Sequence, residues 1–351
     1  MKILVINPGS TSTKIALYED KNELFNKSIT HSADEVSKYD TVYSQFDMRK
    51  NLILKALEDN NYSVDDLDCV IGRGGLFPPL KTGGYIVNEK MVNMVKENKI
   101  PEHASNLGCV IADSIAKPLG IPAYIYDAVS ANDFPPIAKI TGMPEIERKS
   151  FCHVLNSRAM AIKYAKSIKK DYSELNILVA HLGGGITASV HKKGKLVDSL
   201  SDDNGAFSPE RAGSLPILEI IDMCYSGNYT HKVMKKKMRG NGGLVAHLGT
   251  SDCREIEKMI EDGDKKAALV YEAQAYQIAK CVGLLYPVLM GDIDAIILTG
   301  GIAYSDLLIE NVKKYISHMG NIIVLPGEHE MQAMAEGATR ILKGEEEYYT
   351  M

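Results

Sequence analysis

The chain has 351 residues, of which 45% are hydrophobic and 24% are charged, a balance typical of soluble globular proteins. This composition excludes a disordered tail, a collagen-like repeat and a disulfide-stapled mini-protein, and the length favours about two domains. The 40 basic and 45 acidic side chains give a net charge of −5 at pH 7. The chain therefore has no overall positive field that would attract nucleic acid or an anionic membrane.

The cysteines and apolar segments favour a cytoplasmic protein with no membrane partner. Six cysteines are scattered along the chain, and no two are close enough for a CxxC motif or a zinc knuckle. The apolar run at residues 3–6 stops at Asn7-Pro8-Gly9, unlike a secretory signal peptide. The longest apolar stretch, residues 281–291, is shorter than the ~20 residues that cross a bilayer.

The hydrophobic pattern predicts strands that alternate with helices. Residues 3–6 and 14–18 are expected to form two strands around a turn of glycine, serine and threonine. Further along the chain, helices are expected over 34–60, 106–117 and 150–169, and buried strands over 68–71, 123–126 and 294–298. Prolines at 135, 136 and 144 mark an irregular stretch that suits a domain boundary. The alternation predicts an α/β fold.

A weak internal repeat divides the chain. Ile3-Leu4-Val5, followed by Gly9 and Thr13, recurs as Ile177-Leu178-Val179, followed by Gly183 and Thr187. The offset is 174 residues, close to half the chain, and each copy combines a strand, a glycine-rich turn and a second strand. Two interpretations stay open. One is the buried Ile-Leu-Val strand that many α/β proteins share, and the other is a duplicated domain whose two hairpins hold phosphates across a cleft.

Three glycine-rich segments predict contacts with a nucleotide. The turn at 7–14 offers backbone N–H groups, hydroxyls and Lys14, although it lacks Walker A spacing. Three consecutive glycines follow the buried strand at 177–179, and Gly300 and Gly301 precede a predicted helix that starts at Ser305. At the start of another helix, Asp252 could be a cap and Arg254 a solvated side chain. A surface hairpin or a flexible turn is the alternative for the glycine-rich segments.

Together these segments resemble the acetate and butyrate kinase family. The resemblance rests on four runs that stand in the family's order: 4–14, 181–185, 251–254 and 294–302. It implies an α/β fold of duplicated actin-like ATPase (ribonuclease H-like) domains that flank a nucleotide cleft. It also implies an N-terminal, acyl-substrate-side domain of residues 1–149 plus 331–351, and a C-terminal nucleotide-binding domain of residues 150–330.

The resemblance implies transfer of the γ-phosphoryl group of ATP to a short-chain carboxylate, with ATP/ADP as substrate and Mg²⁺ as cofactor. It implies the catalytic residues Asn7, Arg73, Asp127, His153 and Arg211. His103, Gly75 and Cys152 would contact the acid, and Asn7 and Glu330 the metal, with Glu328 as a rival for Glu330. The nucleotide would contact Gly9, Ser10, Thr11, Ser12, Lys14, His181, Gly183, Gly184, Gly185, Asp252, Arg254, Gly300, Gly301 and Ile302.

This reaction needs no general base, because a carboxylate is already deprotonated near neutral pH. The obstacle is to bring an anion against a polyanion. Arg73 and Arg211 can neutralise and align the oxygens with their planar guanidinium groups, while His153 can donate to an oxygen in the transition state. Asp127 is therefore expected to orient an arginine or the metal shell. We expect in-line transfer without a covalent enzyme intermediate.

Departures from the acetate-specific members favour butyrate as the acceptor. Where those carry Val, Phe and Asn, this chain has Gly75, Cys152 and Gly184, and residues 154–157 replace a GTSH-like run. Smaller side chains would leave room for a longer acyl chain, whose buried CH₂ groups contribute roughly 0.8 kcal/mol each. The expected reaction is butyrate + ATP ⇌ butyryl phosphate + ADP. Isobutyrate or isovalerate is the close alternative, and acetate or propionate a further one.

Proteins of other classes stay open as alternatives. A nucleotide-regulated binding protein such as a chaperone ATPase usually carries an extra peptide-binding domain. A filament-forming actin-like protein would not need Arg73 and His153. A sugar kinase would need an aspartate base, for which Asp127 is available. Because dimers are the default of the family, we expect a cytoplasmic homo-oligomer, a dimer or higher, with no nucleic-acid or membrane partner.

Overall fold

The computed structural model describes residues 1–351, except for the side chain of Ala33. The chain forms two compact units. Unit 1 comprises Met1–Ala131 and His329–Met351, and unit 2 comprises Asn132–Glu328. Within the described part of the chain, no helix is both long enough and apolar enough to cross a membrane.

The first boundary falls after Ala131, earlier than the expected position after residue 149. The physical reason is that residues 132–149 bind to a strand of unit 2. The backbone N–H of Asp133 donates to the carbonyl of Leu196 at 2.8 Å, and Arg148 Nη2 pairs with Asp198 Oδ1 at 2.7 Å. The second boundary, after Glu328, lies close to the expected one.

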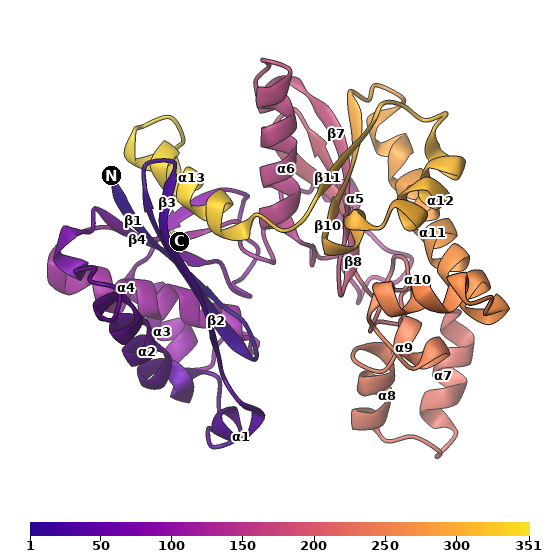
Figure 1. The fold of residues 1–351 in the computed structure, drawn as a ribbon, viewed down its shortest axis with the longest axis horizontal. Coiled ribbons are helices and arrows are strands. Elements are labelled where there is room, and N and C mark those ends of the chain that lie inside the picture. The colour runs from indigo at the N-terminus through magenta and orange to yellow at the C-terminus, as the bar shows by residue number, and fades with distance from the viewer. The chain divides into compact units, whose positions relative to one another are not determined.

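Unit 1 is built on a seven-stranded sheet with the order β12-β5-β6-β4-β1-β2-β3. The strands are β1 (Lys2–Pro8), β2 (Ser12–Glu19), β3 (Asn22–Thr30), β4 (Cys69–Arg73), β5 (Gly84–Ile86), β6 (Ala123–Tyr126) and β12 (Tyr348–Tyr349). Its helices are α1 (Ala33–Val36), α2 (Phe46–Glu58), α3 (Glu89–Lys96), α4 (Leu107–Leu119) and α13 (Glu330–Leu342). Helices α2, α3 and α4 cover one face and α13 the other (Figure 1). Both faces of β1 are thereby shielded from water, and Ile3 to Ile6 are fully buried.

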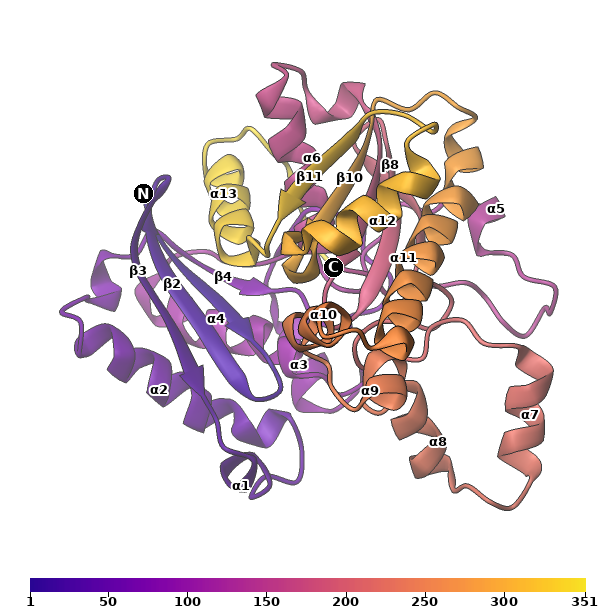
Figure 2. The same ribbon diagram turned by 45° about the vertical axis from the view of Figure 1, so that its right-hand side comes forward.

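Unit 2 is built on a five-stranded sheet with the order β11-β10-β7-β8-β9. The strands are β7 (Asn176–Leu182), β8 (Ile186–Lys192), β9 (Lys195–Leu200), β10 (Ala295–Gly300) and β11 (Ile322–Pro326). Helices α6 (Val154–Ser167), α11 (Lys265–Leu285) and α12 (Asp306–Ile316) cover the sheet. Side chains alternate across β7: Ile177 and Val179 pack with α6, while Leu178 and Ala180 join the core under α11 and α12. Helix α6 covers one face of this sheet, and α11 and α12 cover the other (Figure 2). The other helices of unit 2 are α5 (Pro136–Lys139), α7 (Ile217–Tyr225), α8 (His231–Met238), α9 (Gly243–Leu248) and α10 (Cys253–Glu261).

The two sheets share one topology, so the repeat in the sequence is a duplicated domain. Strands β3-β2-β1-β4-β6 of unit 1 correspond to β9-β8-β7-β10-β11 of unit 2. In both units the first three of these strands are antiparallel and the last two lie parallel to the central one. This result decides between the two interpretations of the repeat.

The first hairpin has a longer turn than the second. Pro8 pairs with Thr13 across the turn of β1 and β2, whereas Leu182 pairs with Ile186 across the turn of β7 and β8. Thr187 therefore lies opposite His181 at the register position where Lys14 lies opposite Asn7. The identity of Thr13 and Thr187 in the sequence is thus not a structural equivalence.

Most of the predicted elements are confirmed. The predicted strands correspond to β1, β2, β4, β6, β7 and β10, and the helices at 106–117 and 150–169 correspond to α4 and α6. The predicted helix at 34–60 is divided, because residues 37–42 are not helical and a 3₁₀ turn, Tyr43–Gln45, precedes α2. The helix predicted from Ser305 is α12, and the Ser305 hydroxyl caps it by accepting from Leu308 N–H.

Candidate functional site

Asn7, Arg73 and Glu330 form one cluster in unit 1, the Arg73 cluster. They come from the ends of β1 and β4 and from the start of α13. The Arg73 guanidinium binds both carboxylate oxygens of Glu330, with Nη1 at 3.1 Å from Oε2 and Nη2 at 3.0 Å from Oε1. Asn7 Nδ2 donates to Glu330 Oε2 at 2.7 Å. Three side chains far apart in the sequence thus make one charged, mostly buried group.

Glycines fix the backbone around Arg73 by allowing very close packing. A Cβ on Gly72 would lie 2.3 Å from the carbonyl oxygen of Gly108, and one on Gly74 would lie 2.5 Å from Ala128 Cα. The end of β4 therefore lies directly against the start of α4 and the segment after β6. Because the opposing atoms are backbone, no larger residue fits at these two positions without moving an element.

Gly75 does not leave open space for an acyl chain. A Cβ at this position would lie 2.2 Å from Asn106 Oδ1 and 2.8 Å from Asn106 Cα. Asn106 is buried and held in place, since its Oδ1 accepts from Leu76 N–H at 2.8 Å and its Nδ2 donates to the carbonyl of Pro101 at 2.9 Å. The argument that a small residue here makes room for a longer substrate is therefore wrong for Gly75.

Asp127 and His103 each support a backbone turn in unit 1. Asp127 is buried with φ +42°, and its Oδ1 accepts from the N–H of Gly83 at 2.8 Å. The Nδ1 atom of His103 accepts from the N–H of Ser105 and caps the 3₁₀ turn Ala104–Asn106. Asp127 thus has a defined structural contact, and its expected role toward an arginine or the metal shell stays a prediction.

His153 and His181 stack on each other in unit 2. Their ring centroids are 3.8 Å apart and their planes differ by 10°. His153 Nδ1 lies 2.9 Å from Thr187 Oγ1. His181 is buried, with Nδ1 at 3.0 Å from Asn156 Nδ2 and Nε2 at 3.5 Å from Glu328 Oε1. Because Asn156 Nδ2 can only donate, His181 Nδ1 is the acceptor and the ring is held as the Nε2–H tautomer.

Arg211 lies against the turn of the second hairpin. A Cβ on Gly185 would lie 2.0 Å from Arg211 Nη1, so the guanidinium occupies the space that a side chain would take. Arg211 Nη1 pairs with Asp202 Oδ2 at 2.5 Å, and Arg239 Nη2 pairs with the other oxygen of the same buried carboxylate at 2.6 Å. Asp202 therefore positions Arg211 over Gly185.

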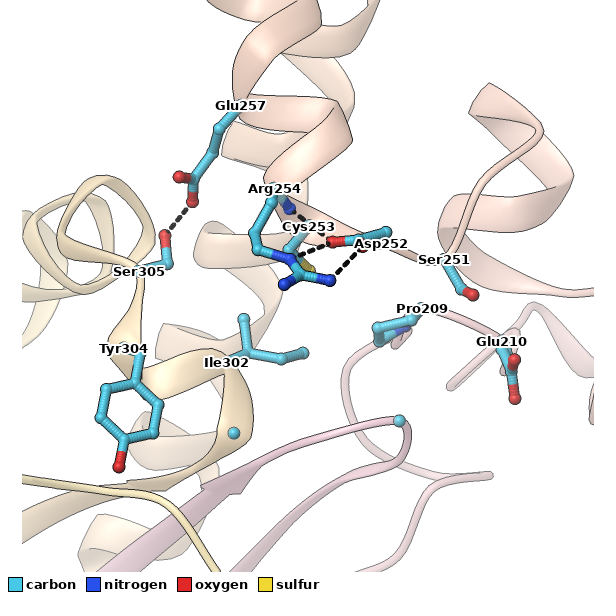
Figure 3. A pocket seen from close by; sticks show the side chains of 12 residues that line it. Pro209, Glu210, Ser251, Asp252, Cys253, Arg254, Glu257, Ile302, Tyr304 and Ser305 are labelled. Atoms are coloured by element: carbon cyan, nitrogen blue, oxygen red, sulfur yellow. Dashed lines mark hydrogen bonds and ion pairs between the residues drawn. The ribbon is translucent and has the colours of Figure 1, made fainter. Parts of the chain in front are cut away.

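A pocket of about 760 Å³ lies in unit 2 (Figure 3). Five residues predicted to bind the nucleotide line it: Gly184, Asp252, Arg254, Gly301 and Ile302. Ser251 and Cys253, from the same 251–254 run, also line it, together with five residues that were not predicted to bind the nucleotide: Pro209, Glu210, Glu257, Tyr304 and Ser305. The pocket thus joins the second hairpin, the start of α10 and the turn after β10, which supports one binding site for these three segments.

At the start of α10, the structure shows that Asp252 caps the helix and that Arg254 is exposed. Both were open possibilities from the sequence. Asp252 Oδ1 accepts from Arg254 N–H at 2.9 Å, and Arg254 Nη2 contacts Asp252 Oδ2 at 2.6 Å (Figure 3). The hydrogen bond from the Arg254 side chain lowers the pKa of Asp252 to about 2. The Arg254 side chain is 90% exposed, so it can move toward a ligand without losing packing contacts.

Other predicted nucleotide residues have structural positions outside this pocket. Gly300 has φ +93° and passes so close to Leu182 that a Cβ would lie 2.3 Å from its carbonyl oxygen. Gly9, Ser10, Thr11, Ser12 and Lys14 belong to the first hairpin, in unit 1. The described residues contain no group of three or more His, Cys, Asp or Glu side chains that could hold a metal ion.

Sequence reasoning missed the residues that support the predicted ones. Asn106 fills the space beside Gly75, Asp202 holds Arg211, and Thr187 contacts His153. Arg49 is buried beneath the first hairpin. Nothing in the local sequence indicates these side chains, because each contact joins segments that only the fold brings together.

Comparisons with known proteins agree with this architecture. The sequence model of the acetokinase family matches residues 148–345. The chain is 47% identical over 348 residues to butyrate kinase 2 of Clostridium acetobutylicum, covering 99% of this chain and 98% of that one. It is 45% identical over 347 residues to butyrate kinase 1 of the same organism, covering 98% of both chains. The acetate kinase structure from Porphyromonas gingivalis has a TM-score of 0.80 at 21% identity and covers 97% of this chain and 99% of that one.

The fold is therefore the duplicated actin-like ATPase fold, as the strand order of both sheets also indicates. Within that fold, the chain belongs to the acetokinase family and is a kinase.

Proposed function

We propose that this kinase catalyses butyrate + ATP ⇌ butyryl phosphate + ADP. The observation that carries the proposal is the identity of 47% and 45% to two butyrate kinases over nearly the whole chain. The deviation Cys152 from the acetate-specific pattern supports the same acceptor, whereas Gly75 no longer does and Gly184 lines the pocket of unit 2. Branched acids such as isobutyrate are the nearest alternative acceptors.

Each unit has its own part in the proposal. The pocket of unit 2 would hold the adenosine moiety, with Gly184 and Gly301 of its lining near the phosphates. In unit 1, the turn of the first hairpin would offer backbone N–H groups to a phosphate. The Arg73 cluster of unit 1 would bind the acid. Exposed glycine turns suit phosphates because their backbone N–H groups can approach closely and donate.

The proposed chemistry depends on positive charge and hydrogen-bond donors. Arg73 and Arg211 would neutralise the two anions, each with a guanidinium that a carboxylate already orients: Glu330 for Arg73 and Asp202 for Arg211. His153 would donate to an equatorial oxygen as charge spreads in the transition state. Asp127 takes no proton in this scheme, since the acid is ionised near neutral pH.

Asn7 and Glu330 have donor chemistry that fits Mg²⁺. The ion prefers amide and carboxylate oxygens and keeps several waters. Asn7 and Glu330 belong to one cluster, in which Asn7 Nδ2 donates to Glu330 Oε2 at 2.7 Å and Asn7 Oδ1 is the amide oxygen that could bind the ion. Glu328 is the weaker candidate, because it is exposed and faces His181. When bound with ATP, the ion would neutralise phosphate oxygens.

Trapping with hydroxylamine tests the reaction. Acyl phosphate formed from ATP and each acid from acetate to valerate, with isobutyrate and isovalerate included, is measured as the hydroxamate. We expect butyrate to give the highest kcat/KM, exceeding acetate by at least about tenfold, because each buried CH₂ contributes roughly 0.8 kcal/mol. Reactions without ATP serve as the blank.

Other outcomes would contradict the proposal in distinct ways. A higher kcat/KM for isovalerate would assign a branched-chain kinase. No hydroxamate from any acid, together with ADP release in the presence of hexoses, would support a sugar kinase. ATP-dependent sedimentation without turnover would support a filament protein.

We also propose that the protein is a cytoplasmic homo-oligomer. Light scattering would measure the mass of the oligomer.

Gly185→Ala is expected to impair catalysis and to preserve the fold. The new Cβ would overlap Arg211 Nη1, the end of a flexible side chain that can move away, so the guanidinium leaves Asp202. We expect kcat to fall about 100-fold, the usual cost of a lost charge-stabilising donor, with only a small fall in the urea midpoint, because Arg239 still pairs with Asp202. Gly142→Ala is the matched control, because nothing lies within 4 Å of its new Cβ. Wild-type kcat in Gly185→Ala would exclude Arg211 from the reaction.

A further inference from the structure

Arg49 is a fully buried cation in the core of unit 1. It belongs to the first half of α2, and its exposed fraction is 0%. Its Nε and Nη2 atoms donate to Gln45 Oε1 at 3.1 and 2.8 Å. A neutral amide thus orients one edge of the guanidinium and leaves the other edge directed at the hairpin of β1 and β2.

The other donors of Arg49 hold the turn of that hairpin. Nη1 donates to the carbonyls of Gly9 at 2.8 Å and Ser12 at 3.2 Å, and to Thr13 Oγ1 at 3.0 Å. Nη2 donates to the carbonyl of Ser10 at 3.3 Å. One side chain therefore binds three of the carbonyl groups of a single short loop.

This arrangement decides where the amide groups of the loop point. In a planar trans peptide the C=O and N–H groups point in opposite directions. Because the carbonyls of Gly9 and Ser10 face Arg49, the N–H groups of Ser10 and Thr11 face away from it. Both residues are exposed, and neither amide has a hydrogen-bond partner within the described part of the chain. Two consecutive outward N–H groups form a concavity that binds anions.

The charge of Arg49 has no carboxylate in direct contact. Among the described side chains, no carboxylate oxygen lies within 4 Å of the guanidinium, and burial lowers the pKa of Arg49, although the more distant charge of Glu35 acts in the opposite direction. A buried cation without a paired anion destabilises the fold unless something compensates it. An anion bound on the outer side of the loop would supply that compensation through the loop's own peptide dipoles.

We propose that Arg49 is a positioning residue that shapes the loop at residues 9–12 into a binding site for the phosphate groups of the nucleotide. The side chain turns the carbonyls inward and the amides outward, and its unpaired charge lies behind them. This inference rests on the proposed function for the identity of the ligand, and it deepens that proposal by naming the residue that builds the site.

The sharpest test places a counterion beside Arg49 without changing the shape of the neighbouring side chain. Gln45→Glu keeps the acceptor for Arg49 and places a carboxylate 2.8 Å from Nη2. We expect the Kd for ADP to rise about tenfold. This is the effect of repulsion between one added negative charge and a phosphate charge roughly 10 Å away, at an effective dielectric constant of about 20. The Kd for adenosine and the KM for butyrate should stay unchanged, and the melting temperature should not fall. Asn22→Asp, the same chemical change on an exposed residue of unit 1, is the control.

The outcomes separate this inference from the proposed function. Calorimetric titration with ADP and adenosine needs no turnover, so it tests the loop even if no acid gives a hydroxamate. An ADP Kd within twofold of wild type in Gln45→Glu would show that Arg49 is only structural. If that variant does not fold, Arg49→Lys decides, because lysine keeps the charge but cannot bridge the loop carbonyls and Gln45. A selective loss of ADP affinity of at least fivefold is then expected, and equal losses for ADP and adenosine would overturn the proposal.

Discussion

Arg73→Ala is expected to lower kcat for acyl phosphate formation by about a thousandfold or more, the largest effect on activity among our predictions. The variant loses a guanidinium that would face both the carboxylate of the acid and the phosphate groups of ATP. It also leaves the Glu330 carboxylate, which Arg73 binds through both oxygens, without its partner. The uncompensated Glu330 would repel the incoming acid. Hydroxamate formation under saturating ATP and butyrate measures the loss.

Arg148→Ala is the matched control for this prediction. Arg148 binds both oxygens of Asp198 in unit 2, at 2.7 and 3.3 Å, and this pair is buried to a similar degree. Both variants should lose stability, but only Arg73→Ala should lose catalysis. Arg73→Lys should restore little activity, since an ammonium group cannot bind Glu330 and a substrate oxygen with the same planar geometry. Equal kcat values in the Arg73 and Arg148 variants would refute a catalytic role for Arg73.

Gly75→Val is expected to destabilise the protein by about 3 kcal/mol, the largest effect on stability. The Cβ alone would overlap Asn106 Oδ1 at 2.2 Å, and Asn106 Cα lies only 2.8 Å away. Asn106 cannot move aside easily, because it holds the backbone at Leu76 and Pro101. Unfolding in urea measures the change, and Gly142→Val, where space is open, is the control.

The same variant tests how the enzyme selects acyl length. If Gly75 serves packing, activity on acetate and butyrate should fall together, and the ratio of their kcat/KM values should stay within about twofold. A variant that unfolds at the wild-type urea concentration and now prefers acetate would restore Gly75 as a determinant of substrate length. Cys152 then remains the position whose size can be tested separately.

Local pattern predicted much of the fold because burial and turns leave signals in short segments. The run at 177–179 is apolar on both faces, which is typical of a central strand covered on both sides. Ser305 and Asp252 carry the signature of helix caps, and the structure shows both caps. The break between α1 and α2 was missed, since residues 37–42 lack the Gly and Pro residues that usually mark an interruption.

The sequence by itself determined the α/β class, the repeat and the glycine turns. These features leave their signals within short segments, because the hydrophobic pattern of a strand and the composition of a turn involve only residues that are neighbours in the sequence. Only the tertiary structure decided that the repeat is a duplicated domain, that its two turns differ in length, and that Asn106 fills the space beside Gly75. It also placed Glu330 on Arg73 and Arg49 beneath the first hairpin, contacts that span 257 and 40 residues of sequence. The composition showed no net positive charge, and the fold shows which carboxylates, amides and carbonyls hold the guanidinium groups of Arg73, Arg211 and Arg49 in place.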